Sequence, residues 1–363
     1  MEKLKNIEFL RVFLITNIVL LHVHVSSAWS FSKVFPKSNL YQFLHDCFAA
    51  SNNCVEGFFI IAGFLLFYTF KPNKSIKEFI LKKYIRLSPA ILFATLLCII
   101  GWLLGVMHFK LIPNLLTVLL LNHFGRCWVI GCMAVLWYVS AMFSGLLIYF
   151  SILKFVVQKY QKYVITILAI LGYIILEYFQ KGRFSDPYHN YYYIFNIGFL
   201  RAIGGIGLGC LIGMILKNFK FDYTKTVTNK KIIAVTFIEL TFLIFLIWWT
   251  MYPHGRINNI VFVIGFAILF LLFIIQKGYI SKFFNKEIWI FLGKYSYSIY
   301  VTHYAVGKIL VKTIWKHNQH FVYSHPYIPI IITLLIILLV GILTYHMVEL
   351  PCTKYLKAKL IRK

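Results

Sequence analysis

Acidic residues are scarce in this sequence: 11 Asp and Glu stand against 37 Lys and Arg among 363 residues, and the formal net charge is +26. Charged residues of both signs make up only 13% of the chain, whereas hydrophobic residues make up 60% and the mean hydropathy is +0.78. A soluble domain contains roughly 45–50% apolar and 25% charged residues. The composition therefore excludes an ordinary water-soluble fold.

The excess of positive charge does not have the pattern of a nucleic-acid-binding surface. Nucleic-acid binders collect Lys and Arg on one face or along one helix, but here these residues form short clusters between long apolar stretches. That distribution is typical of a membrane protein whose cytoplasmic loops lie against an anionic leaflet. We therefore expect membrane lipids, and no nucleic acid, among the partners of this protein.

The seven cysteines lack the spacing of a metal site. Cys98 and Cys210 lie inside apolar runs, where a cysteine behaves as a small buried hydrophobic residue. The sequence therefore predicts no bound metal.

Ten apolar stretches are long enough to cross about 30 Å of hydrocarbon at 1.5 Å per residue. They cover approximately residues 9–29, 54–70, 87–107, 132–153, 163–179, 195–216, 232–251, 257–276, 295–315 and 327–348. We interpret the first as a retained helix and not as a cleaved secretory signal, because it carries Arg11 and His22. The shorter segment 111–122 is expected to lie at the interface or to re-enter the membrane. The sequence thus predicts an all-α integral membrane protein with about ten transmembrane helices.

Positive charge alternates between the predicted connections. The two termini and every second loop together hold 26 Lys and Arg, whereas the intervening loops hold eight. Positively charged loops stay on the cytoplasmic side, so we expect both the N-terminus and the C-terminus in the cytoplasm. We divide the chain into a transmembrane domain, 1–352, and a basic cytoplasmic tail, 353–363, of a multi-pass protein in the cell (plasma or inner) membrane.

Ionisable side chains inside the predicted helices are the first candidates for function, because each costs at least about 2.5 kcal/mol in hydrocarbon. Arg11 and His22 are eleven positions apart, close to three helical turns, so they share one helix face about 16 Å apart along the axis. Glu8 lies one turn before Arg11 and can pair with it. Two alternatives stay open: Arg11 also fits a positive-inside anchor, and His22 also fits a buried neutral histidine with a hydrogen-bond partner.

Other ionisable residues lie within or at the ends of the remaining predicted helices. They are Glu56, Arg86, Glu177, Arg201, Glu239, His303, His346 and Glu349. Each by itself is weak support for a functional site, and those at helix ends can reach the interface. The helix that begins near Arg201 is rich in glycine, for which close packing between helices is the simplest explanation.

The first two predicted helices resemble those of the membrane-bound acyltransferase-3 family. The first helix of that family carries an Arg, ten intervening residues and a His, usually with an acidic residue three positions before the Arg. Glu8, Arg11 and His22 match that spacing. The family's second-helix motif resembles VEGFFIIAGFLLF, in which Glu56, Phe58, Phe59 and Gly63 match and Ala62 stands where the family usually has Ser.

Later segments resemble further motifs of the same family in the same order. The matching residues are Lys83, Arg86 and Pro89 in KKYIRLSPA, Trp137 in LWYVSAMF, Ser296, Tyr297, Tyr300 and His303 in YSYSIYVTH, and Glu349 and Pro351 in VELP. Each motif is short, but together they are collinear over nearly the whole chain.

The resemblance implies transfer of an acyl group, usually acetyl from cytoplasmic acetyl-CoA, to a hydroxyl of a cell-envelope polysaccharide or glycolipid. His22 would act as general base on the acceptor hydroxyl or as a transient acyl carrier, with Arg11 as the second catalytic residue. Arg11, Arg86 and Lys83 would bind the phosphates of coenzyme A. Supporting or substrate-binding roles would fall to Glu8, Glu56, Trp137, Arg201, Tyr297, Tyr300, His303 and Glu349.

Some members of the family carry a C-terminal extracytoplasmic hydrolase-like domain. This sequence stops soon after its tenth predicted helix, so we expect the protein to act alone or to pass the acyl group to a separate extracytoplasmic transferase.

The alternative function is a transporter or exporter of an envelope glycan precursor that uses an intramembrane proton relay, although the sequence shows no paired halves. A membrane scaffold is a third interpretation, which leaves His22 and Arg11 without a purpose.

Overall fold

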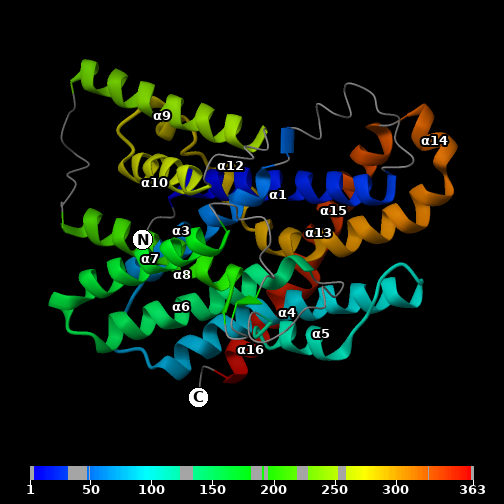
Figure 1. The fold of residues 1–363 in the computed structure, drawn as a ribbon, viewed down its shortest axis with the longest axis horizontal. Helices are drawn as coiled ribbons and strands as arrows, with labels where there is room; N and C mark the ends of the chain where they lie inside the picture. Colours follow the sequence, from blue (N-terminus) through cyan, green and yellow to red (C-terminus); the bar gives the residue numbers. More distant parts are fainter. Residues whose placement is uncertain are drawn as a thin grey trace.

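The computed structural model describes residues 4–31, 47–48, 50–122, 134–180, 190–191, 195–218, 228–251, 259–325 and 327–360. Within these ranges the chain forms a helical bundle. Long helices such as α1 (Lys5–Phe31), α6 (Trp137–Phe155) and α9 (Asn229–Met251) run roughly along the longest axis of the molecule (Figure 1).

The remaining elements complete the bundle and its connections. The other α-helices are α3 (Cys54–Tyr68), α4 (Ile76–Leu103), α5 (Leu111–Val118), α7 (Gln158–Gln180), α8 (Ile197–Asn218), α10 (Ile260–Ile275), α11 (Tyr279–Phe283), α12 (Glu287–Gly293), α13 (Ser296–Leu310), α14 (Gln319–Ser324), α15 (Tyr327–Thr344) and α16 (Leu350–Leu360). Two 3₁₀ turns, η1 (Ser51–Asn53) and η2 (Ala134–Leu136), precede α3 and α6. Two π-helical segments, η3 (Val311–Trp315) and η4 (Tyr345–Glu349), extend α13 and join α15 to α16. Two-residue strands β1 (Asn190–Tyr191) and β2 (Phe195–Asn196) pair antiparallel, with Asn190 opposite Asn196.

Each of the ten stretches predicted to cross the membrane coincides with one of these helices, and the all-α membrane class is confirmed. Among the described residues, eight helical segments are long and apolar enough to span a membrane. The two other stretches are α10, which is shorter, and α13, which continues through η3. The segment after α4 forms only the eight-residue helix α5, which is too short to cross.

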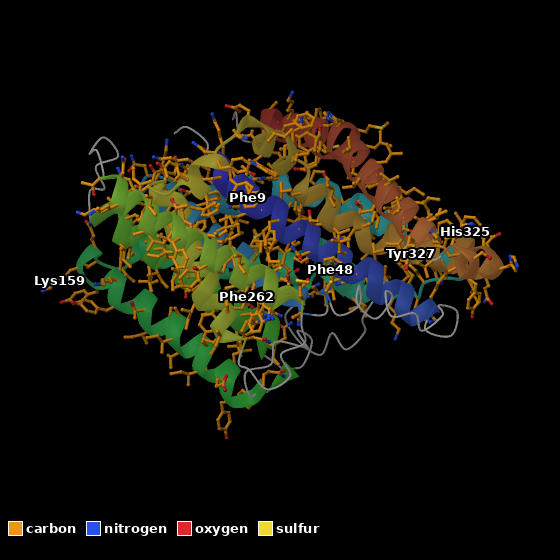
Figure 2. The ribbon with its side chains drawn as sticks, turned by 90° about the horizontal axis from the view of Figure 1, so that it is seen from above. Phe9, Phe48, Lys159, Phe262, His325 and Tyr327 are labelled. Atoms are coloured by element: carbon orange, nitrogen blue, oxygen red, sulfur yellow. The ribbon has the colours of Figure 1, made fainter. Side chains whose placement is uncertain are left out.

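Loops that the sequence assigned to opposite sides of the membrane lie at opposite ends of the bundle. Lys159, at the start of α7, and His325, just after α14, lie far apart along the long axis (Figure 2). Glu8 in the first turns of α1 and Lys357 near the end of α16 line one cavity, so the two ends of the described chain share one side. That this side faces the cytoplasm stays a prediction.

The helices α3 and α8 approach each other so closely that their backbones touch. A Cβ atom on Gly63 would collide with the backbone of Ile206, and a Cβ atom on Gly209 would collide with that of Ile60. Only glycine permits this approach, as at other small-residue interfaces between membrane helices. The packing role predicted for the glycines of α8 is confirmed.

The core lies around α8, while α7 and α9 are on the outside. Large buried side chains such as Phe59, Tyr149 and Phe266 surround the centre, whereas α7 and α9 expose apolar side chains such as Ile174 and Phe237. Exposed apolar side chains at these positions suit contact with lipid tails. The helices that carry the candidate site, α1, α4, α13 and α16, pack against one another beside this core.

Candidate functional site

The packing of α1 against α13 brings His22 and His303 into contact. The Nε2 atom of His303 lies 3.2 Å from the Nδ1 atom of His22, and the ring centroids are 5.0 Å apart. The sequence analysis named both residues as site candidates but did not pair them. They are 281 positions apart, and only the helix packing shows that they form one unit.

Backbone carbonyl groups determine which ring nitrogens of the two histidines carry hydrogen. The Nδ1 of His303 lies 2.6 Å from the carbonyl oxygen of Tyr300, and the Nδ1 of His22 lies 2.8 Å from that of Ile18. A carbonyl oxygen can only accept, so in each neutral ring Nδ1 is the donor and Nε2 the acceptor. The Nδ1–H of His22 is then shared between Ile18 and the Nε2 of His303. We therefore assign the unprotonated nitrogen of His22 to Nε2, the atom that can accept a proton.

Arg11 and Glu8 form the ion pair that their spacing predicts. The guanidinium of Arg11 donates to both carboxylate oxygens of Glu8, at 3.1 and 2.9 Å. The side chains of Arg11 and Glu8 remain 21% and 16% exposed, and both line a cavity of about 200 Å³. Three further candidates from the sequence, Arg86, Tyr297 and Glu349, line the same cavity. The cavity therefore gathers five of the predicted residues at the end of the bundle where the chain begins.

Hydrogen bonds fix the helices around this cavity. The hydroxyl of Tyr297 donates to the carbonyl oxygen of Leu87 at 2.7 Å, which joins α13 to α4. The hydroxyl of Ser298 donates to Glu349 at 2.5 Å, which joins α13 to η4. Glu349 lies in a π-helical segment, an irregularity that is frequent at functional sites. These contacts position α13, and with it His303, relative to the cavity.

Tyr300 connects α13 to the 3₁₀ turn η2. Its hydroxyl donates to the carbonyl oxygen of Val135 in η2, while its own carbonyl is the acceptor for His303. Tyr300 thus anchors the segment that carries His303, which gives it a supporting place beside the histidine pair.

Lys83 and Arg86 lie one turn apart on α4 and line a second, larger cavity of about 770 Å³. Arg86 lines both cavities. The sequence analysis grouped Arg11, Arg86 and Lys83 as one phosphate-binding set, and the structure distributes them over two cavities that share Arg86. Their role in binding a donor stays a prediction.

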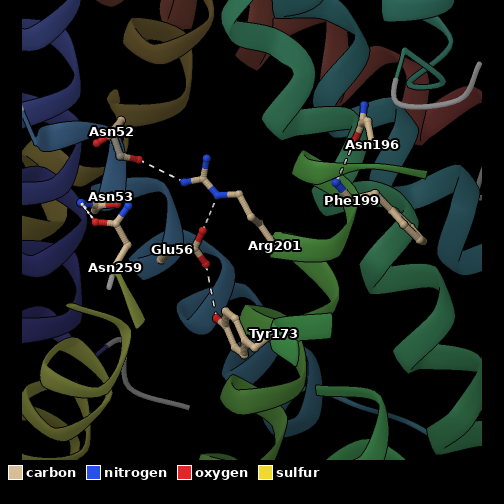
Figure 3. Close-up of polar contacts among 8 residues, drawn as sticks. All are labelled: Asn52, Asn53, Glu56, Tyr173, Asn196, Phe199, Arg201 and Asn259. Carbon is tan, nitrogen blue, oxygen red and sulfur yellow. Dashed lines mark hydrogen bonds and ion pairs between the residues drawn. The ribbon is translucent and has the colours of Figure 1, made fainter. Parts of the chain in front are cut away.

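Three other candidates, Glu56, Arg201 and Trp137, form a separate buried cluster. Figure 3 shows the first two of them. The Nε of Arg201 donates to Glu56 at 2.5 Å, and its terminal nitrogen donates to the carbonyl oxygen of Asn52 at 3.2 Å. The hydroxyl of Tyr173 donates to the second carboxylate oxygen of Glu56 at 3.3 Å. The guanidinium of Arg201 also lies 5.0 Å from the ring centroid of Trp137, within the range of a cation–π contact. The cluster joins α3, α6, α7 and α8.

Neighbouring polar contacts fix the ends of the helices in this cluster. Asn196 accepts from the backbone N–H of Phe199 at 2.9 Å and so caps the first turn of α8. The side chain of Asn53 donates to that of Asn259 at 3.2 Å, which connects the start of α3 to the start of α10 (Figure 3). Tyr173 and these asparagines are not among the candidates from the sequence, because neutral polar residues near helix ends give no charge signal.

Within the described ranges, no group of three or more His, Cys, Asp or Glu side chains could hold a metal ion. The two histidines at the contact of α1 and α13 are held by carbonyl groups and by each other. An arrangement of this kind suits proton transfer.

Comparisons with known proteins agree with the motifs. The model of a family described as "Acyltransferase domain" matches residues 4–346. Similar curated proteins are the O-acetyltransferases OatA of the Staphylococcus aureus strains NCTC 8325 / PS 47, COL and MRSA252. Each is 24% identical over 335 residues, an alignment that covers 83% of this chain and 52% of the relative. The chain thus spans about half the length of the curated relatives it matches. No solved structure matches it.

Proposed function

Because the chain belongs to the membrane-bound acyltransferase-3 family, we propose that it moves an acetyl group from acetyl-CoA to a hydroxyl of a cell-envelope polysaccharide or glycolipid. The observation that carries this proposal is the contact between His22 and His303. It leaves the Nε2 of His22 as a proton acceptor on the same face of α1 as Arg11. The name of the relatives, O-acetyltransferase, supports acetyl as the transferred group.

His22 supplies the base that the reaction needs. The acceptor hydroxyl has too high a pKa to attack a thioester unaided, so the Nε2 of His22 takes its proton as the oxygen attacks the carbonyl carbon. The bond between that carbon and sulfur then breaks, and the leaving thiolate takes the proton from His22. The products are an ester on the glycan and free coenzyme A. In the second route, Nε2 itself attacks the thioester, the bond between carbon and sulfur breaks, and coenzyme A leaves as a thiolate. The acceptor hydroxyl then attacks the acetyl group on Nε2, the bond between carbon and nitrogen breaks, and the proton of the hydroxyl goes to the thiolate.

The positions of Arg11 and His22 suit a donor that is charged at one end and reactive at the other. The phosphates of coenzyme A are joined to its thioester by a long flexible arm. Arg11, Arg86 and Lys83 can hold the phosphates near one membrane surface, while the thioester reaches the depth of His22, about 16 Å further along α1. The donor enters from the side that carries the positive loops, which the charge distribution assigns to the cytoplasm.

The acceptor lies on the opposite side in this proposal. The acetyl group passes from the depth of His22 either directly to the glycan hydroxyl or to a separate extracytoplasmic transferase that completes the reaction. Both routes place His22 before any extracytoplasmic step. Loss of His22 therefore stops both of them.

Mass spectrometry of envelope glycans tests this function. Wild-type, deletion and His22→Ala cells are compared for the mass increment of an acyl group, with His320→Ala as a control at an exposed histidine. We expect the increment in wild-type and His320→Ala cells and its loss in the other two. Equal modification in all four strains would overturn the proposal. Loss of the glycan itself from the surface of His22→Ala cells would favour a transporter.

A further inference from the structure

The larger cavity has the composition of a site for a polyanion. Seven of its thirteen lining residues are Lys or Arg, and none of these described lining residues is acidic. Glu78 lies nearby and forms an ion pair with Lys82, which offsets one of the seven charges. A concave site with one sign of charge attracts ligands of the opposite sign. The cavity therefore suits a ligand with several negative charges.

One side of the cavity belongs to the beginning of α4. Ser75 caps this helix by accepting from the backbone N–H of Glu78 at 3.0 Å. The preceding turn, which carries Lys74, is held by Lys154 of α6, whose ammonium group donates to the carbonyl oxygens of Pro72 and Lys74 at 3.0 and 2.8 Å. The lysines on this side thus extend from a fixed backbone.

The other side of the cavity belongs to α16, which supplies Lys354 and Lys357. The hydroxyl of Thr353 donates to the carbonyl oxygen of Ile85 at 3.3 Å, so α16 lies beside the turn of α4 that carries Arg86. Lys357 lines the smaller cavity as well as the larger one, as Arg86 does. The helix α16 lies beyond residue 346, where the match to the family ends.

Aromatic side chains form the wall between the positive groups. Phe79 and Phe150 stack with their ring centroids 4.2 Å apart, and Phe70 meets Phe150 edge to face at 5.5 Å. All three line the cavity. Phosphate groups suit the positive side chains. Phe79 and Phe150 are buried and stack on each other, whereas Phe70 is only partly buried, so Phe70 is the ring of the three that a purine base can contact. A nucleotide uses both, whereas a lipid headgroup uses only the charges.

We propose that α16 completes a nucleotide-binding cavity in which Lys354 and Lys357 bind phosphate groups of the acyl donor, opposite Lys83 and Arg86 of α4. This rests on the proposed function for the identity of the donor. Arg86 and Lys357 line both cavities, so the nucleotide cavity borders the smaller one, which Arg11 also lines. The segment called a tail in the sequence analysis thereby becomes part of the donor site.

Kinetics with two donors test the role of α16. The full-length protein in nanodiscs of zwitterionic lipid transfers acetyl to extracted envelope glycan, either from acetyl-CoA or from S-acetyl-N-acetylcysteamine, which lacks the nucleotide. For the double variant Lys354→Gln, Lys357→Gln we expect the KM for acetyl-CoA to rise about tenfold, as for lost charge-assisted hydrogen bonds. The kcat and the KM for the short thioester stay unchanged. Lys359→Gln, on the same helix but outside the cavity lining, is the matched control and leaves all values unchanged.

Three outcomes would overturn the proposal. One is an unchanged KM for acetyl-CoA in the double variant, and another is an equal rise for both donors. The third is an effect that appears only in nanodiscs of anionic lipid, because the lysines would then bind lipid headgroups.

A binding measurement separates this proposal from the proposed function. Equilibrium dialysis with adenosine 3′,5′-bisphosphate needs no catalysis, and we expect binding by the wild type that weakens about tenfold in the double variant. Binding without any acetyl transfer by the wild type would contradict the proposed function and leave the nucleotide site standing. Transfer by a wild type that does not bind the bisphosphate would contradict the nucleotide site alone.

Discussion

Glu8 and Arg11 form an ion pair within one helix beside a cavity, whereas Glu56 and Arg201 form one between two helices inside the bundle. The first pair is three positions apart, with side chains 16% and 21% exposed. The second pair is 145 positions apart, with side chains 0% and 1% exposed. The same two residue types therefore occur in opposite environments.

The difference indicates that Arg11 can bind a ligand, whereas Arg201 stabilises the fold. Arg11 pairs with the carboxylate of Glu8 and lines a cavity, so a phosphate can approach it. Arg201 donates to Glu56 and Asn52 and covers Trp137, so its charge is compensated by its neighbours. The pair of Glu8 and Arg11 is partly exposed beside a cavity and therefore lies nearer to exposed pairs, which contribute up to about 1 kcal/mol to stability. Removing one partner of a fully buried pair costs about 3–5 kcal/mol.

The largest expected effect is on stability, at Arg201. Replacing Arg201 with Ala leaves the carboxylate of Glu56 buried without its cation, so we expect the free energy of unfolding to fall by about 3–5 kcal/mol. Denaturant or thermal unfolding of the purified protein measures this change. The double variant Glu56→Leu, Arg201→Met removes both charges and recovers much of the loss. An Arg201→Ala protein within about 1 kcal/mol of the wild type would contradict the structural role.

At Arg11 we expect the opposite: a small change in stability and a large change in donor binding. Replacing Arg11 with Ala changes the free energy of unfolding by less than about 1 kcal/mol but raises the KM for acetyl-CoA about 10- to 100-fold, because a charged hydrogen bond to phosphate is lost. Lys5→Ala is the matched control, since Lys5 lies on the same helix as Arg11 and pairs with the exposed Glu287 of α12 at 2.7 Å. A degraded or misfolded Arg11→Ala protein would instead support the membrane-anchor interpretation.

Of the effects expected at Arg201, Arg11 and His303, the smallest is at His303, which we interpret as a positioning residue. His303→Ala removes the acceptor that helps to hold the Nδ1–H of His22, so kcat falls about tenfold, as for a misplaced catalytic group, while the KM for acetyl-CoA is unchanged. In His303→Gln an amide oxygen can accept the same hydrogen, and we expect partial recovery of kcat. Equal loss in both variants, or a change confined to KM, would contradict this role.

The helices, one ion pair and one close helix contact could be predicted, because each depends on residues that are near one another in the sequence. The apolar stretches gave the helices, because crossing a bilayer fixes both length and composition. The pairing of Glu8 with Arg11 followed from their separation by one turn. The glycines of α8 also indicated close packing correctly, since a missing side chain has few other uses in a membrane helix.

Contacts between distant segments could not be predicted in this way. The pairs His22 with His303 and Glu56 with Arg201 depend on which helices become neighbours and in what rotation. One sequence contains no signal for that choice. Apart from Lys83, the lysines of the large cavity were counted only as loop charge, although their clustering around the start of α4 and after α15 was visible.

Acetyl transfer by His22→Ala protein is the most direct test of the account. Proteoliposomes with wild-type or variant protein receive radiolabelled acetyl-CoA and extracted envelope glycan, and the label in the glycan is measured over time. We expect labelling by the wild type and only background labelling by His22→Ala, with unchanged unfolding temperature and unchanged binding of adenosine 3′,5′-bisphosphate. A folded His22→Ala protein that labels the glycan at the wild-type rate would contradict the central role of His22.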